Sequence, residues 1–473
     1  MPTDVVESHS HIKIITRGDT MIKKLKWNNH DVLGNLELDF TKPDGSIYNT
    51  IILAGENGAG KTTILETLST FLNLGSIEPF EYISYLASGV PYTITPKPDD
   101  DPKFGFHIRK NELDGTTHSI RTNRNNSPDS INLDQADLRH YGFSYTKARS
   151  GFSTAKVKSA TIQQLDSEKY ESDSKDDFTS IKQLIVDVDG QDNSEWMKIT
   201  KSGIGTSFET FKSTSKMYRF EKAFNDFFDT VQFNRVDNTN PDEIKILFEK
   251  HGKEIPVDDL STGEKQIVFR GAHLLKNINS MSDGIVLIDE PELSMHPKWQ
   301  QKVLKYYRSL FNNNGTQNAQ MIIATHSEYV LRSALEDRDN VLIIVLSDNN
   351  GSINSKNITA PTILPTITSA ETNYIAFGIL SVDYHIELYG YLQNKTGNLA
   401  VKSCDDYIVA QTTYYNPALH AKPSSFTNQY GHTTHYQTLP TYVRNLIDHP
   451  NPTQAYTQEE FKRSIELLIE LCR

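Results

Sequence analysis

Residues 50–63 read TIILAGENGAGKTT, and this stretch decides the fold. Its first half is a short apolar run ending in glycine, which favours a buried strand. The residues that follow, TILETLSTFL, place Ile64 and Leu68 on one helical stripe. Between strand and helix, Gly55 to Thr62 fit the pattern GxxxxGK followed by Ser or Thr. The order strand, glycine-rich loop, helix predicts a phosphate-binding loop.

The residue types of this loop suit a nucleoside triphosphate. Glycines let backbone N–H groups turn inward around phosphate oxygens, the lysine reaches the terminal phosphates, and the threonine hydroxyl can ligate Mg²⁺. The following helix directs its positive end at the same anion. The residues expected to bind ATP in this loop are Gly55, Asn57, Gly58, Gly60, Lys61, Thr62 and Thr63.

A second motif, DGIVLIDEPEL, lies downstream. Its apolar residues predict a buried strand that ends in Asp289 and Glu290, at the edge where open parallel sheets bind ligands. We expect Asp289 to hold Mg²⁺, directly or through water, and Glu290 to polarise the attacking water as a general base. Taken alone, such a pair could cap a helix. Beside a phosphate-binding loop, the catalytic interpretation is favoured.

Residues 260–266, LSTGEKQ, resemble the ABC signature sequence LSGGQ. Thr262 and Glu264 are departures of a kind also seen in the SMC-related branch. The resemblance implies that Ser261 and Gly263, with Glu264 beside them, open a helix whose N–H groups grip the γ-phosphate of ATP. In ABC enzymes the signature of one protomer completes the site on the other. A homodimer, or a higher oligomer, with nucleotides sandwiched between protomers is therefore implied.

Two further parts of an ABC site have candidates. His326, after the strand MIIAT, resembles the switch histidine that contacts the γ-phosphate, although a lone histidine at a strand end is more often structural. The residues from Ser294, SMHP, resemble the loop that crosses the dimer interface. The glutamine that usually contacts magnesium has no clear counterpart, and Gln163 and Gln164 are the two guesses.

Composition excludes several classes of protein. No apolar run approaches the roughly 20 residues of a membrane helix, and the first residues show no secretory signal, so we expect a cytoplasmic protein without membrane contact. Cys404 and Cys472 are too few for a disulfide scaffold or a zinc site. With a formal net charge of -12, nucleic acid contact requires a local patch. One candidate is KARSGFSTAKVKS, residues 147–159, for which a solvated strand face is the favoured alternative.

These observations predict an α/β fold, an ABC-type P-loop ATPase head with a mainly parallel sheet. We expect the head over residues 1–360, with the weakly patterned residues 75–235 as an inserted lobe. After the two-proline linker ITAPTILPT, four helix-favouring segments predict a C-terminal helical partner-binding domain over residues 361–473.

The tail resembles the end of the PtuA ATPases of Septu antiphage systems, which also occur in some retron operons. The matching stretches are SAETNYIAFGILSVDYHIELYGYLQ from Ser369 and TLPTYVRNLIDHPNP from Thr438. This family pairs its ATPase with an HNH nuclease, PtuB. The resemblance implies an ATP-hydrolysing component of an antiviral complex that regulates such a nuclease acting on DNA or RNA. A retron reverse transcriptase and its multicopy single-stranded DNA are further candidate partners.

A ribonuclease within this chain is an alternative. Arg444 and His449 fit the pattern RNxxxH, similar to the HEPN ribonucleases, where arginine holds the RNA phosphate and histidine moves the proton. His432, His435 and Tyr442 could line a groove beside them. The favoured alternative is that His449 ends the helix LPTYVRNLID, where a cation is stabilising.

An SMC-type DNA-repair ATPase is a third interpretation. The span between Lys61 and Ser261 lacks the long heptad series of an SMC arm. A Toprim nuclease, which joins a similar head in the overcoming-lysogenization-defect family, is not expected. Residues 361–473 contain no DxD cluster for its metal site.

Overall fold

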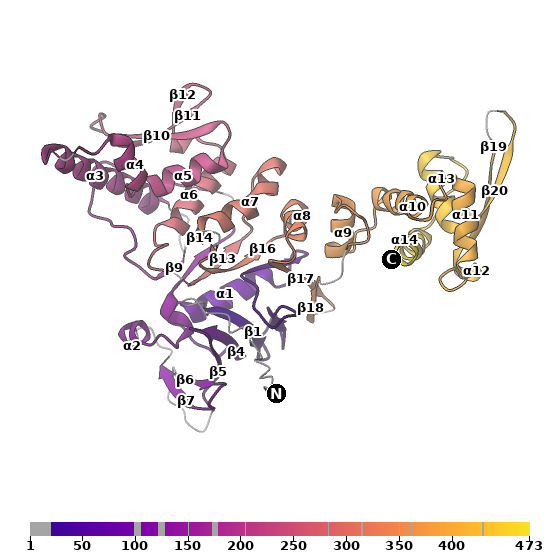
Figure 1. Cartoon of the computed structure of the whole chain (residues 1–473), viewed down its shortest axis with the longest axis horizontal. Coiled ribbons are helices and arrows are strands. Elements are labelled where there is room, and N and C mark those ends of the chain that lie inside the picture. The colour runs from indigo at the N-terminus through magenta and orange to yellow at the C-terminus, as the bar shows by residue number, and fades with distance from the viewer. Residues whose placement is uncertain are drawn as a thin grey trace, which may run out of the picture.

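The computed structural model describes most of the chain in two bodies (Figure 1). The first and larger body carries the strands up to β18, and the second holds the C-terminal helices beyond α9. The described residues are 20–98, 106–121, 128–149, 151–172, 178–203, 205–281, 283–313, 316–349, 351–358, 362–427 and 430–473.

A seven-stranded sheet forms the centre of the larger body, in the order β18-β17-β3-β16-β13-β8-β9. Neighbouring strands from β17 to β9 run parallel, and β18 pairs antiparallel at the edge. The strands are β3 Thr50–Gly55, β8 Phe143–Thr146, β9 Tyr170–Ser172, β13 Ile285–Asp289, β16 Gln320–Ala324, β17 Val341–Asp348 and β18 Ile353–Asn357. The predicted mainly parallel α/β sheet is confirmed. The predicted phosphate loop, acidic pair and histidine follow β3, β13 and β16, and therefore meet at one edge.

A second, antiparallel sheet covers one face of this centre, in the order β2-β1-β4-β5-β6-β7. Its strands are β1 Met21–Trp27, β2 Glu37–Asp39, β4 Phe80–Ala87, β5 Val90–Pro96, β6 Phe106–Asn111 and β7 Thr117–Arg121. Helix α1, Lys61–Leu72, packs in the core that the two sheets share. Alternate side chains of β3 face opposite ways. Ile51 and Leu53 belong to this core, whereas Ile52 and Ala54 belong to the core on the other face.

Helices and a small sheet cover the other face of the central sheet (Figure 1). The helices are α3 Thr179–Lys201, α4 Phe208–Thr214, α5 Tyr218–Phe227, α6 Thr262–Leu275, α7 Pro297–Leu310 and α8 Glu328–Glu336. The small sheet has β11 Lys245–Lys250 between β10 Val231–Asp237 and β12 Lys253–Pro256. Short elements complete the body, namely α2 Pro128–Leu133, η2 Leu138–Tyr141, η3 Val257–Asp259, β14 Asn312–Asn313 and β15 Thr316–Gln317.

The predicted inserted lobe over residues 75–235 is wrong in its extent. Strands β4 to β7 belong to the antiparallel sheet, and β8 and β9 belong to the central sheet. The inserted part is narrower: α3 to α5 and the small sheet, over residues 179–256, lie outside the two large sheets and share a core with the central one. The hydrophobic signal was weak because several of these strands are poorly buried. Strand β7, for example, has no buried residue.

The C-terminal body has its own core, which includes Leu388, Leu392, Ile465 and Leu468. Its helices are α10 Val382–Thr396, α11 Val401–Ala410, α12 Pro417–His420, α13 Leu439–Asp448 and α14 Gln458–Cys472, and α9 Ser369–Phe377 precedes them with contacts to both α8 and α10. A hairpin, β19 Ala421–Thr427 and β20 Thr433–Thr438, corrects the purely helical prediction. Its first strand, AKPSSFT, has no buried residue and therefore no apolar alternation.

The two cysteines are free, buried thiols within this C-terminal body. Burial raises the pKa of Cys404 to about 11 and that of Cys472 to about 12. Among the helices of the described ranges, none has both the length and the apolar character that a bilayer crossing requires.

Candidate functional site

Glycine is required at both ends of the loop between β3 and α1. Gly55 has φ +143°, and a Cβ there would lie 2.3 Å from the carbonyl oxygen of Leu346 on β17. Gly60 has φ +83° and ends the loop in the left-handed conformation. A Cβ on Gly58, at φ +85°, would meet nothing within 4 Å, so the loop is open on that side. The backbone therefore has the shape of a phosphate cradle.

The lysine of the loop is held over this cradle. Lys61 Nζ donates hydrogen bonds to the carbonyl oxygens of Gly55 at 2.8 Å and Glu56 at 2.9 Å. Burial lowers the pKa of Lys61, and the nearby carboxylates of Glu290, Asp289 and Glu292 oppose that shift. Its ammonium can exchange two loop carbonyls for phosphate oxygens without leaving the loop.

Thr62 and Asp289 form a pair that fits a magnesium ion. The Thr62 hydroxyl donates to Asp289 Oδ2 at 3.0 Å, which joins the start of α1 to the end of β13. Asp289 is buried, and its Oδ1 has no hydrogen-bond partner. Burial raises the pKa of this carboxyl. A hydroxyl beside an unpartnered carboxylate oxygen suits Mg²⁺, which takes few protein ligands and several waters or phosphate oxygens.

Glu290 and His326 lie side by side at the same sheet edge. His326 Nδ1 is 3.2 Å from Glu290 Oε1, and both side chains are partly exposed. Glu290 adopts φ +45°, and its N–H donates to the carbonyl oxygen of Ala324 at 2.9 Å. This left-handed conformation is uncommon for a residue with a Cβ. The chain therefore turns sharply between Asp289, the predicted magnesium ligand, and Glu290, the predicted base.

Glu292 supports the histidine and escaped the sequence reasoning. Its Oε1 accepts the Thr325 hydroxyl at 2.5 Å and the His326 N–H at 3.3 Å. The side chain is buried, and burial raises its pKa. Glu292 thus ties the loop after β13 to the loop after β16. The only signal in the sequence was a third acidic residue in DEPE.

Arg270 of α6 was missed as well, and it joins two strand ends. One guanidinium nitrogen donates to the carbonyl oxygens of Asp289 and Glu290, each at 3.0 Å. The other donates to the carbonyl oxygen of Lys147 at 2.6 Å. Arg270 is 1% exposed. A buried arginine inside the apolar run IVFRGAHLL was the available signal.

The signature residues form the start of α6. Ser261 is the N-cap, and Ser261 and Glu264 make a capping box in which each side chain binds the other's backbone N–H. Gly263 leaves no room for a side chain, since a Cβ would lie 2.9 Å from the Ser294 carbonyl oxygen in the predicted interface loop. The signature and that loop therefore pack together within one chain.

The structure does not join the signature to the phosphate loop of the same chain. Helix α6 packs on one face of the central sheet and α1 on the other. Between residues 50–63 and 260–266, both fully described, no hydrogen bond or ion pair occurs. Of the other loop residues, Asn57 is exposed and Thr63 is half-buried in the first turn of α1.

The two guessed glutamines are not near this edge of the sheet. Gln163 and Gln164 are exposed, and the Gln163 N–H donates to Asp187 of α3. In the parallel pairing of β8 and β13, Thr146 is opposite Ile288. The residues beside Asp289 are therefore those that begin at Lys147, and the sequence there, KAR, contains no glutamine.

The basic stretch 147–159 does not form the expected strand face. Its described residues form isolated bridges rather than a strand, such as the bridge between Val157 and Ile244. Arg149 is buried and lies over the Phe178 ring, whereas Lys156 is mostly exposed. Lys147 forms an ion pair with Glu66 of α1 at 3.1 Å.

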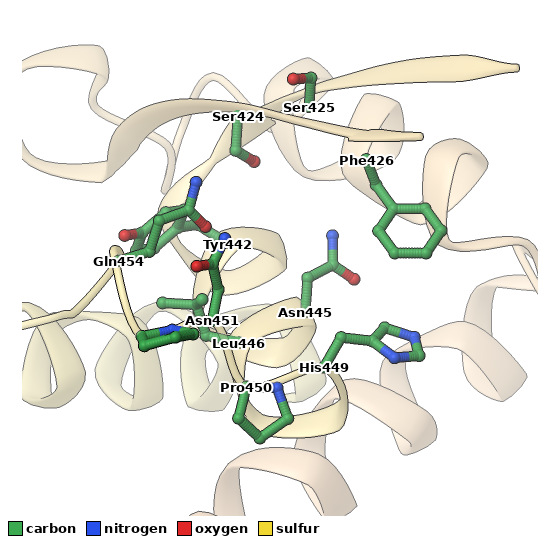
Figure 2. A pocket seen from close by; sticks show the side chains of 11 residues that line it. Ser424, Ser425, Phe426, Tyr442, Asn445, Leu446, His449, Pro450, Asn451 and Gln454 are labelled. Atoms are coloured by element: carbon green, nitrogen blue, oxygen red, sulfur yellow. The ribbon is translucent and has the colours of Figure 1, made fainter. Parts of the chain in front are cut away.

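In the C-terminal body, Arg444 and His449 are not brought into one groove. Arg444 forms an ion pair with Asp448 at 2.7 Å within α13. His449 follows α13 as its C-cap residue and stacks on Phe426, with ring centroids 5.1 Å apart. A groove of about 370 Å³ lies between β19 and α13. Asn445 and His449 are among its lining residues (Figure 2). Its lining includes Tyr442 and excludes Arg444, His432 and His435.

Comparisons with known proteins agree with this geometry. Residues 51–332, more than half of the chain, match the family model described as "AAA domain, putative AbiEii toxin, Type IV TA system". The retron Vc95 probable ATPase of Vibrio cholerae is 29% identical over 26% of this chain and 23% of its own length. The retron Ec83 probable ATPase of Escherichia coli is 27% identical over 33% of this chain and 28% of its own length. The matches thus span about a quarter of each retron protein.

The Septu protein PtuA of Bacillus thuringiensis is 23% identical over 66% of this chain and 74% of its own length. Among solved structures, the Smc head domain of Pyrococcus furiosus with ScpA aligns at a TM-score of 0.38 and 14% identity, over 72% of this chain and 96% of that one. The SMC head domain of Thermotoga maritima aligns at 0.37 and 12%, over 72% and 99%. By the family match, the chain belongs to the AAA-domain family of P-loop ATPases, and it is similar to the ATPases of Septu and retron systems.

Proposed function

We propose that this chain binds and hydrolyses ATP with Mg²⁺ at a site that a second copy completes. The observation that carries the proposal is the meeting of Lys61, the Thr62–Asp289 pair and Glu290 at one sheet edge. The signature helix lies across the sheet from them, so one chain holds two halves of different sites. A head-to-tail homodimer would join each phosphate loop to the signature of the other protomer.

Each residue at the edge has a chemical role in this proposal. Thr62 and Asp289 would hold Mg²⁺, which neutralises charge on the phosphate oxygens. Lys61 binds the terminal phosphates, and the loop N–H groups surround them. Glu290 orients the attacking water and accepts its proton, while His326, held 3.2 Å from that carboxylate, contacts the γ-phosphate. The helix that Ser261 and Gly263 open in the second copy would supply the opposing N–H groups.

We further propose that the ATP cycle regulates a nuclease in an antiviral complex. The names of the Septu and retron relatives support this role. The partner would be an HNH nuclease of the PtuB type, acting on DNA or RNA, and a retron reverse transcriptase with its single-stranded DNA would be a further partner in a retron setting. The C-terminal body, with a core of its own, is the proposed partner-binding domain.

The dimer is tested by sizing two variants with and without ATP. Glu290→Gln keeps the phosphate loop and removes the base, so ATP is expected to trap a species of about twice the mass. Lys61→Ala should bind no ATP and should not change in size. A folded Glu290→Gln protein with unchanged mass in ATP would refute the sandwich, unless wild type is already a dimer without nucleotide. Purification of the tagged chain with its native operon tests the HNH partner by mass spectrometry.

A ribonuclease in the tail is the second candidate function. One observation favours it, which is that His449 and Asn445 line a groove with an aromatic wall. Arg444 would have to leave Asp448 to take part. Incubating the purified chain alone with RNA tests this function. Cleavage that His449→Ala abolishes would support it, and intact RNA would exclude it.

A further inference from the structure

The signature helix carries a charge where the ABC pattern has none. Glu264 stands at the position of the glutamine in LSGGQ. A carboxylate in the first turn stabilises a helix through the helix dipole. The same negative charge repels a phosphate that approaches this helix end, because like charges in a partly desolvated site interact strongly. A site that uses Ser261 and Gly263 to bind the γ-phosphate therefore needs this charge balanced.

The ion pair and the hydrogen bonds of the Glu264 carboxylate all stabilise its negative charge. Its side chain is 3% exposed, and Oε1 lies 2.7 Å from Nζ of Lys250. Its Oε2 accepts both the N–H and the hydroxyl of Ser261, each at 2.8 Å. Burial alone would raise the pKa of Glu264, but the bonds from Lys250 and Ser261 hold it below the ordinary value. The carboxylate is therefore ionised and needs the ammonium beside it.

The hairpin before the signature places this lysine. Lys250 is the last residue of β11 and pairs with Lys253, the first residue of β12. His251 and Gly252 between them have φ +53° and +74°, as a tight two-residue turn requires. Strand β12 then continues through η3 to Ser261. The same short segment thus supplies both the signature and the cation that neutralises it.

We propose that Lys250 is a positioning residue of the nucleotide site. It neutralises Glu264 and so leaves the first N–H groups of α6 as an attractive surface for the γ-phosphate of ATP held by a second copy. This inference rests on the proposed function, since it assumes that the signature completes a site in trans. The Lys250 side chain is 33% exposed, so substitutions there can be made without opening a buried cavity.

Four forms of the full chain test the role of Lys250, namely wild type, Lys250→Met, Glu264→Gln and the double variant. Steady-state hydrolysis of ATP with Mg²⁺ gives KM and kcat for each form. Lys250→Met leaves the buried Glu264 carboxylate without its counter-ion, and we expect KM for ATP to rise about tenfold or more. With Glu264→Gln already present no charge remains to balance, so the same lysine change should raise KM less than about threefold. Lys250→Arg should keep most of the affinity.

Two results would overturn the role of Lys250. One is an equal rise in KM in both backgrounds, which would mean that Lys250 acts on the phosphate or the fold rather than through Glu264. The other is a wild-type KM for Lys250→Met, with or without a lower melting temperature. Lys250 would then contribute at most to the stability of the fold. Failure of the trans site itself would look different. Wild type would then not hydrolyse ATP, or Glu290→Gln would not dimerise with it, whatever stands at position 250.

Discussion

Replacing Arg270 by methionine should damage both the stability of the head and its catalysis. Methionine keeps much of the apolar stem of the arginine but removes the guanidinium, which donates to the carbonyl oxygens of Lys147, Asp289 and Glu290. A hydrogen bond to a charged group contributes roughly 1.5–3 kcal/mol, and such bonds do not add fully. Because Arg270 is 1% exposed and its loss leaves these carbonyl groups without their donor, we expect a loss of about 3–5 kcal/mol in the free energy of unfolding of the head.

The catalytic effect should exceed the effect on binding. The arginine holds the backbone of Asp289 and Glu290, so its loss lets the acidic pair shift, and a displacement of about 1 Å in an active site can lower kcat about 100-fold. Lys61 and the loop glycines are untouched, so KM should change less. Thermal unfolding and steady-state ATP hydrolysis measure the two effects, and Arg332→Met, which alters a partly exposed arginine on α8, is the matched control. An Arg270→Met protein with wild-type kcat and melting temperature would refute this reasoning.

Three other changes test separate parts of the structure. Glu292→Ala leaves the Thr325 hydroxyl and the His326 N–H without their acceptor, so kcat should fall about tenfold. Glu292→Gln should have a smaller effect because an acceptor oxygen remains. If Glu292→Ala hydrolysed ATP as fast as wild type, Glu292 would not be needed to position His326. Gly263→Ala places a Cβ 2.9 Å from a backbone oxygen and should lower ATP hydrolysis, while Gly190→Ala, with open space around it, should not. His385 is buried, and burial lowers its pKa to about 3 from an ordinary 6.5, so the unfolded chain gains a proton first as pH falls. The stability that depends on neutral His385 is complete above pH 6.5 and is lost as pH falls from there towards 3, by roughly 2 kcal/mol at pH 5. The melting temperature should fall less between pH 7 and pH 5 for His385→Gln than for wild type, because the buried His107 and His273 still contribute, whereas the exposed control His435→Gln should behave like wild type.

Patterns that repeat along the sequence predicted most of the fold. The strand TIILAG and the helices LPTYVRNLID and QEEFKRSIELLIELC have the predicted bounds, because each buries a regular face in a core. Prediction failed where the elements are exposed. Strands β7 and β19 contain no buried residue, so their sequences carried no alternation, and the full extent of the antiparallel sheet and the tail hairpin were missed. Edge and hairpin strands are fixed by backbone pairing that almost any polar sequence can make.

Some residues of the site could likewise be predicted from the sequence, and others could not. The phosphate loop, the acidic pair and the signature were predictable because their chemistry needs particular residue types at fixed spacing. Arg270 was not predictable, since its three acceptors are backbone carbonyl groups, which every residue has, on segments far apart in the sequence. Lys250 escaped for a related reason. Its partner Glu264 looked like a tolerated departure from LSGGQ, and only the fold places the compensating cation 2.7 Å from it. When a motif gains a charged residue, its counter-ion can come from a segment that is distant in the sequence. The double variant of Lys250 and Glu264 therefore tests the role of the glutamate in LSTGEKQ more directly than either change alone.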